Sequence, residues 1–200
     1  MREAKSAGAI LFEYVEPKGK TVLEIGCGTG ELARELTARG ARVIAIDREA
    51  MLAAAASAPR AGNERYVAAS GESLPVRDGS ADLVLYIASL HHLPSERLDD
   101  AMAECRRVLR PGGRAAFIEP VYRRGSYTDL TRLVEDERAV QRLAYQAILR
   151  AGSADLEMLV EEPFFIARSF ADYETLIATF VEEPAKRPEI LGRAKAITAR

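Results

Sequence analysis

The chain has 200 residues, of which 48 % are hydrophobic and 29 % are charged, proportions typical of a globular protein with one core. A formal net charge of -2 argues against a generally basic surface that binds nucleic acid. No apolar run approaches the roughly 20 residues that span a bilayer, and the N-terminus leads into no apolar core of the signal-peptide type. We therefore expect a cytoplasmic protein with no membrane and no nucleic-acid partner.

The first 120 residues show a hydrophobic pattern that predicts alternating helices and strands. Helices are expected at 4–15, 29–39 and 49–58, followed by one that Ser95 caps and that 111–113 end. Strands are expected at 21–25, 42–46, 65–69, 82–87 and 114–119. Strands separated by single helices favour parallel pairing with right-handed crossovers. The expected fold class is α/β, a doubly wound and mostly parallel sheet with helices on both faces.

Beyond Pro120 the pattern changes. Helices are expected at 128–150, 172–181 and 186–199, with a strand-like segment at 164–170 and no later strand. The first of these helices has an apolar face and is expected to cover a substrate pocket. Arg123 and Arg124 are expected in a solvated loop, with recognition of an acidic substrate as the alternative.

The most informative segment is VLEIGCGTG at 22–30, a strand that turns sharply into a helix. Only glycine lets backbone amides approach a ligand so closely, which makes Gly26, Gly28 and Gly30 candidate binding residues. Asp47 closes the next strand, close to the distance of about 20 residues at which a βαβ unit presents a carboxylate to a ribose. A structural turn and a helix-capping role for Asp47 are the alternatives.

The residue after the last glycine restricts the ligand. A dinucleotide site would have a third glycine where this chain has Glu31, whose charge would oppose a pyrophosphate at the helix N-terminus. The Gly-Lys-Ser/Thr sequence of a P-loop is absent as well. A nucleoside without phosphates is therefore the expected ligand.

The two cysteines, Cys27 and Cys105, lack C-x-x-C spacing, so neither a disulfide framework nor a structural zinc site is expected. Cys27 is interpreted as a small residue suited to the turn, with some added reactivity at a helix N-terminus as the alternative.

Further segments follow the glycine loop in a fixed order: Asp47, SGESLP at 70–75, DGSADLV at 78–84, SLHHL at 89–93 and RVLRPGG at 107–113. Together they resemble the class I S-adenosylmethionine-dependent methyltransferases, in the small-molecule branch called type 11 or UbiE-like. The resemblance implies a Rossmann-like fold and one methyltransferase domain over 1–200, with 1–120 as the cofactor-binding core and 121–200 as the lid and C-terminal elements. Family members normally end with an antiparallel strand. Either the native chain continues past Arg200, or the sheet is completed in another way.

The resemblance also implies roles in binding S-adenosylmethionine. The glycine loop would lie against the methionine part of the cofactor, Glu24 near its amino group, and Asp47 on both ribose hydroxyls. Other residues would flank the adenine, with Ser70 standing where relatives commonly have aspartate. The expected cofactor-binding residues are Glu24, Gly26, Cys27, Gly28, Gly30, Asp47, Arg48, Met51, Ser70, Gly71, Glu72, Ile87 and Ala88.

Methyl transfer asks the protein to position the acceptor and to manage its proton. His91 is the candidate general base, and a hydrogen bond within its loop is the structural alternative. His92 is interpreted as a packed or capping residue. Adjacent side chains diverge, so no metal site is expected.

The leading hypothesis is an enzyme that methylates an O, N or C atom of a small-molecule acceptor and leaves S-adenosylhomocysteine. A cofactor-binding module without catalysis and, less favoured, a nicotinamide-dependent oxidoreductase are the alternatives. A monomer and a homodimer fit the sequence equally well, and the sequence does not identify the acceptor.

Overall fold

The computed structural model describes residues 2–4, 6–122, 132–154, 156–166, 170–181 and 184–198. The chain forms two compact units, of which the first comprises Met1–Pro120 with Leu143–Ile166 and the second Val121–Arg142 with Ala167–Arg200. Arg123, Arg124 and the start of the helix predicted at 128 lie outside the described residues.

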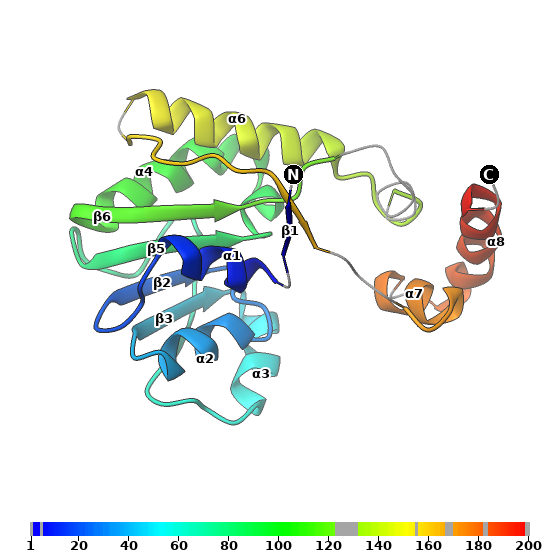
Figure 1. Ribbon diagram of the computed structural model, residues 1–200, viewed down its shortest axis with the longest axis horizontal. Helices are drawn as coiled ribbons and strands as arrows, with labels where there is room; N and C mark the ends of the chain where they lie inside the picture. The colour runs from blue at the N-terminus through cyan, green and yellow to red at the C-terminus, as the bar shows by residue number, and fades with distance from the viewer. Residues whose placement is uncertain are drawn as a thin grey trace. The chain divides into compact units, whose positions relative to one another are not determined.

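A five-stranded parallel sheet with the order β4-β3-β2-β5-β6 forms the centre of the first unit (Figure 1). Its strands are β2 (Thr21–Ile25), β3 (Arg42–Asp47), β4 (Arg65–Ala68), β5 (Ala81–Ile87) and β6 (Leu109–Ile118). All five predicted strands are present, and β6 begins earlier than predicted because Leu109 already pairs with Ala81. The strand order reverses between β2 and β5, which is where ligands bind in sheets of this kind.

Helices cover both faces of this sheet, as predicted. The helices α1 (Ala7–Tyr14), α2 (Glu31–Ala38) and α3 (Glu49–Ser57) belong to one face, and α4 (Leu98–Val108) and α6 (Arg138–Ala154) to the other. Neighbouring strand residues alternate between the two cores: Val22 lies in the same cluster as Leu36 of α2, whereas Leu23 lies in the other cluster with Met102 of α4. The sequence therefore forms a doubly wound α/β fold.

Three helices begin at least three residues later than the sequence predicts. The first helix begins at Ala7, because the Ser6 hydroxyl accepts the Ala9 N–H at 3.0 Å and caps it. Ser95 starts a short 3-10 turn, η2 (Ser95–Arg97), and the α4 helix that follows ends at Val108. Of the helix predicted at 128–150, the described part begins at Arg138, where the Asp136 carboxylate accepts the Arg138 N–H, a group without a partner inside the helix.

A short strand that the sequence did not predict, β1 (Arg2–Ala4), pairs in parallel with β7 (Phe164–Ile166). Ala4 therefore lies in a strand and not in the predicted helix. The strand-like reading of 164–170 is confirmed for its first residues. Within the described residues, the main sheet has no antiparallel strand.

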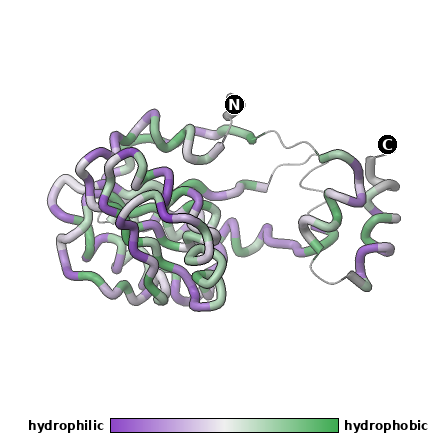
Figure 2. The backbone as a smooth tube through the Cα atoms, turned by 90° about the horizontal axis from the view of Figure 1, so that it is seen from below, coloured by the Kyte–Doolittle hydropathy of each residue, from purple (hydrophilic) through white to green (hydrophobic). Residues whose placement is uncertain are grey.

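The second unit contains α7 (Tyr173–Phe180), the 3-10 turn η3 (Pro184–Lys186) and α8 (Arg187–Thr198). The side chains of Ile177, Val181, Ile190 and Ala194 form a small core of their own. Figure 2 shows hydrophobic stretches alternating with hydrophilic ones along these helices. None of the described helices has the length and apolar character of a membrane span.

Candidate functional site

The predicted site residues lie at one edge of the parallel sheet. Glu24 lies in β2 and the glycine loop directly follows that strand, while Asp47 ends β3, Ser70 follows β4 and Ile87 ends β5. Because the strands are parallel, their carboxyl ends meet at the same edge (Figure 1).

The glycine loop requires glycine for two different reasons. Gly26, Gly28 and Gly30 all have positive φ, at 76°, 52° and 74°. A Cβ at Gly26 would lie 2.3 Å from the Cβ of Ser89, and one at Gly30 would lie 2.6 Å from the Tyr66 hydroxyl. A Cβ at Gly28 would meet no atom within 4 Å. Two glycines thus close the loop onto the protein, while Gly28 faces open space.

Asp47 holds this loop by its carboxylate. One oxygen accepts the Gly28 N–H at 2.7 Å and the other accepts the Arg48 N–H at 2.7 Å. The N-cap residue of α3 is Arg48 and not Asp47, and its side chain makes no capping hydrogen bond. The alternative of Asp47 as a helix cap is therefore not observed. A carboxylate oxygen has further lone pairs, so Asp47 can accept hydrogen bonds from a ligand while it keeps the loop in place.

Glu24 is buried beside this carboxylate with a side chain that is only partly satisfied. Within the described residues, its Oε2 has no hydrogen-bond donor. Burial, together with the nearby charge of Asp47, raises the pKa of Glu24 to about 8, although Arg34 acts in the opposite direction. Such an orphaned acceptor fits a ligand that brings its own donor or positive charge.

The Cys27 thiol is not a reactive group. It is buried in the loop, and this burial, with the charges of Glu24 and Asp47, raises the pKa of Cys27 to about 12. Because the thiolate is the reactive form, the alternative of added reactivity is contradicted, and Cys27 acts as a small packing residue.

The residues expected around an adenine lie just after the ends of β3 and β4. Arg48 and Met51 are exposed at the start of α3. The Ser70 hydroxyl donates to the Glu72 carboxylate. Gly71 is buried, and a Cβ there would lie 2.9 Å from the Tyr86 hydroxyl, so only glycine fits beneath this turn.

Side chains of α4 hold the segment that follows Gly71 in place. The Arg107 guanidinium donates to the carbonyls of Leu74 and Val76 at 3.1 and 2.9 Å and to the Glu104 carboxylate, which itself accepts the Leu74 N–H at 2.7 Å. The hydrogen bond from Arg107 holds the pKa of Glu104 below its ordinary value. The RVLRPGG segment therefore supports the binding edge without reaching it.

Backbone strain marks the end of β5. Ala88 has a φ of 49°, and it is the one residue other than glycine with a positive φ in the described part of the chain. Its N–H donates to the Ile118 carbonyl at 2.7 Å, which holds the strained turn next to the half-buried Ile87. Strain of this kind persists where the surrounding structure enforces it, commonly at functional sites.

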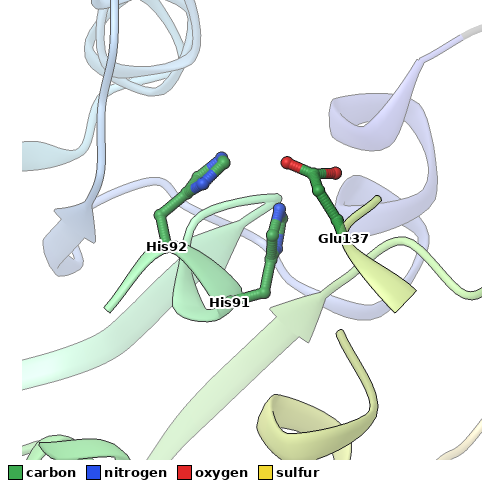
Figure 3. A group of neighbouring side chains, drawn as sticks. All are labelled: His91, His92 and Glu137. Carbon is green, nitrogen blue, oxygen red and sulfur yellow. The ribbon is translucent and has the colours of Figure 1, made fainter. Parts of the chain in front are cut away.

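The two histidines follow on a single 3-10 turn, η1 (Leu90–His92), and Figure 3 shows their side chains. His91 is buried and His92 is exposed, with ring centroids 4.1 Å apart. Nδ1 of His91 lies 2.5 Å from the carboxylate of Glu119, a residue outside the histidine's own loop. The interpretation of His92 as packed is wrong, because its side chain reaches solvent.

Sequence reasoning missed Glu119, which directly follows β6. Its other carboxylate oxygen accepts the N–H groups of Ser89 and Leu90 at 3.0 and 2.9 Å. The signal was available, because Glu119 is an acid at the carboxyl end of a parallel strand, as Asp47 is.

Part of this sequence matches a known protein family. A family described as a methyltransferase domain matches residues 23–117. These residues are therefore similar to a methyltransferase domain. The matched segment runs from β2 into β6 and includes the glycine loop, Asp47 and the two histidines, whereas Glu119 lies just beyond it.

Curated proteins that are similar to this chain carry corresponding names. An uncharacterized methyltransferase of Mycobacterium sp. (strain KMS) is 38 % identical over 130 residues, which are 63 % of this chain and 50 % of the relative. A malonyl-[acyl-carrier protein] O-methyltransferase of Methylococcus capsulatus is 39 % identical over 110 residues, 53 % of this chain and 39 % of the relative. The chain thus spans half or less of the length of these curated relatives.

A solved structure supports the same fold. The S-adenosylmethionine-dependent methyltransferase from Mesorhizobium loti is 28 % identical, with a TM-score of 0.51 over 57 % of this chain and 53 % of that one. The sheet and helices described above therefore have the Rossmann-like class I methyltransferase fold.

Proposed function

We propose that the chain transfers a methyl group from S-adenosylmethionine to an O, N or C atom of a small-molecule acceptor. The observation that carries the proposal is the pair of carboxylates on the neighbouring strands β2 and β3. Asp47 holds the glycine loop through Gly28, and Glu24 presents a buried, unsatisfied oxygen beside it. Glu24 suits the amino-acid part of the cofactor, and Asp47 suits its ribose.

Each part of the site fits a chemical group of that cofactor. The cofactor's ammonium would supply the donor that Glu24 Oε2 lacks, and the ribose hydroxyls would donate to Asp47. Gly28 leaves room for the ligand next to both. When bound, the cofactor supplies an activated methyl group on a sulfonium, whose sulfur keeps the bonding electron pair and becomes a neutral thioether.

The geometry argues against a dinucleotide in the same place. Glu31 lies in the first turn of α2, where a pyrophosphate would need a favourable N-terminal charge. Calorimetry with S-adenosylhomocysteine and with NADH compares the two ligands directly, and preferential binding of NADH would contradict the proposal.

The first test is Asp47→Ala. Loss of charge-assisted hydrogen bonds, each worth on the order of 1.5 to 3 kcal/mol, should weaken binding of S-adenosylhomocysteine by about tenfold or more in a calorimetric titration. Glu49→Ala, an exposed carboxylate in the first turn of α3, is the matched control and should bind like the parent. Unchanged affinity of Asp47→Ala would remove the ribose assignment.

The second test separates an enzyme from a binding module. The parent protein is incubated with S-adenosylmethionine and a panel of small hydroxyl, amine and carboxylate compounds, and release of S-adenosylhomocysteine is measured. A protein that binds the cofactor with ordinary affinity yet releases no product with any acceptor would favour the binding module.

A further inference from the structure

The turn that follows β4 carries a half-buried carboxylate, that of Glu72, at the binding edge of the first unit. Asp47 at the end of β3 pairs with Ala68 of β4. Two residues beyond Ala68 the chain turns back, and the Ser73 N–H donates to the Ser70 carbonyl at 3.0 Å to close the turn. Glu72 therefore lies on a short, closed turn directly next to the strand that Asp47 ends.

The Ser70 hydroxyl fixes the Glu72 side chain on this turn. A hydroxyl has one proton to donate, and Ser70 donates it to Oε2 of Glu72. In the described part of the chain this hydroxyl is the one hydrogen-bond donor to Glu72, so Oε1 keeps its lone pairs for a ligand. A carboxylate is a stronger acceptor than a hydroxyl, which makes Glu72 the main acceptor of the turn.

The order of the strands tells which part of a ligand meets this turn. Asp47 in β3 lies between Glu24 in β2 and the turn that follows β4. In S-adenosylmethionine the amino-acid part and the base are attached to opposite ends of the ribose. A ligand whose ammonium meets Glu24 and whose ribose meets Asp47 therefore directs its base toward Glu72.

The chemistry of a carboxylate restricts the base. Adenine carries an exocyclic amine, which donates hydrogen bonds, whereas hypoxanthine carries at the same position a carbonyl, which only accepts. A carboxylate has no proton to donate to that carbonyl. We propose that Glu72, positioned by the Ser70 hydroxyl, selects an amino-substituted purine by accepting a hydrogen bond from the exocyclic amine. This inference rests on the proposed function and adds the residue that sets the base preference of the cofactor site.

The test compares S-adenosylhomocysteine with S-inosylhomocysteine, in which hypoxanthine replaces adenine. In calorimetric titrations the parent should bind S-adenosylhomocysteine tighter by about tenfold or more, because a hydrogen bond to a charged group is lost with the second ligand. Glu72→Ala should reduce this preference to about threefold or less. Equal affinities of the parent for the two ligands would overturn the proposal without any variant.

The substitution Glu72→Gln separates base selection from simple closure of the turn. The Ser70 hydroxyl can donate to the amide oxygen, which leaves the amide NH2 to face the ligand as a donor. This variant should bind S-adenosylhomocysteine more weakly than the parent and S-inosylhomocysteine more tightly, by about tenfold. A residue that only closes the turn would change both affinities alike, so equal shifts for the two ligands would contradict the proposal.

The positioning role of Ser70 has its own readout. Ser70→Ala should lose most of the preference between the two ligands, and Ser70→Thr, which keeps the hydroxyl, should restore it. Glu96→Gln, an exposed carboxylate in η2, is the matched control and should keep the parental ratio. If the parent binds neither ligand, the proposed function and this inference both fail. If it binds S-adenosylhomocysteine and Glu72→Gln keeps the parental ratio, this inference alone fails.

Discussion

Glu24 is a buried side chain whose protonation is coupled both to folding and to ligand binding. It lies in a central strand beside Asp47, and burial raises its pKa to about 8. The folded protein therefore keeps a proton that the unfolded chain loses at lower pH. A cationic ligand group at Oε2 would lower this pKa again, so ligand binding near neutral pH should release a proton.

The first prediction concerns stability. Between the ordinary Glu value of 4.5 and about 8, the folded state binds more protons at Glu24 than the unfolded state, so stability falls as pH rises through this window. The slope approaches about 1.4 kcal/mol for each pH unit. Glu24→Gln should remove this slope and become more stable than the parent toward pH 8, as measured by urea unfolding at several pH values.

Glu104→Gln provides the comparison with opposite sign. The Arg107 hydrogen bond lowers the pKa of Glu104, so its contribution to stability is present above the ordinary pKa and is lost in acid. This variant should be less stable than the parent near neutral pH and should approach it as the pH falls. Parallel curves for the parent and Glu24→Gln would contradict the buried, protonated Glu24.

The second prediction concerns the thiols. Burial raises the pKa of Cys27 and Cys105 to about 12, so hardly any thiolate exists at neutral pH. A chromogenic disulfide reagent should leave both thiols unmodified in the folded protein and react with both in urea. Ser57→Cys, exposed on α3, is the positive control, and rapid reaction of the folded parent would disprove the prediction.

At the scale of elements, the turns after β2 and β5 support each other. The Ser89 hydroxyl donates to the Ile25 carbonyl at 2.6 Å, and its Cβ occupies the space beside Gly26. The glycine loop and the turn that carries His91 are therefore packed as one piece, with Glu119 fixing the far side of the second turn.

This packing gives the third prediction. Gly26→Ala places a Cβ 2.3 Å from Ser89 at a φ of 76°, and the strain and overpacking should cost roughly 2 to 5 kcal/mol. Gly192→Ala, within α8 and with open space around it, should instead leave stability equal or raise it by up to about 1 kcal/mol. Urea unfolding of both variants measures the difference, and equal stabilities would contradict the close contact.

These elements show which parts of the structure could be predicted from the sequence and which could not. A strand such as β5, apolar from Leu83 onward and buried on both faces, could be predicted closely, because its pattern depends on its own residues. The strand β1 could not, since Arg2-Glu3-Ala4 has no hydrophobic pattern and becomes a strand only through pairing with distant β7. The pairing of Glu119 with His91 likewise depends on the adjacency of β5 and β6, which no local motif encodes.

At the scale of the whole molecule, the first unit is not continuous in sequence. The core beneath β2 and β5 includes Ala144 and Ala147 of α6, with Leu143, Ile148 and Ala151 packed around them. The helix α6 is further tied to α4 by the ion pair of Arg150 with Asp99 at 2.6 Å. The helix α6, which follows Pro120 in the sequence, therefore covers the same face of the sheet as α4 and completes its core.

The fourth prediction follows from that core. A fragment of residues 1–120 would expose the apolar side chains that α6 covers, at a cost of about 1.5 to 3 kcal/mol for each Leu or Ile side chain that loses its burial. A fragment of residues 1–166 retains α6 and β7. We expect a cooperative thermal transition and dispersed NMR signals from the longer fragment only. A stably folded shorter fragment would contradict the structural role of α6.

The pairing of β1 with β7 also has a practical consequence. Arg2 lies opposite Phe164 on a neighbouring parallel strand, so the first residues of the first unit and its last residues are adjacent in space. Because neighbouring strands are about 4.8 Å apart and rise about 3.3 Å per residue, a linker of a few residues could join Ile166 to Arg2. Circular permutation, with new ends opened in the exposed loop at Gly79, would then leave the glycine loop, Asp47 and Glu119 on an uninterrupted sheet.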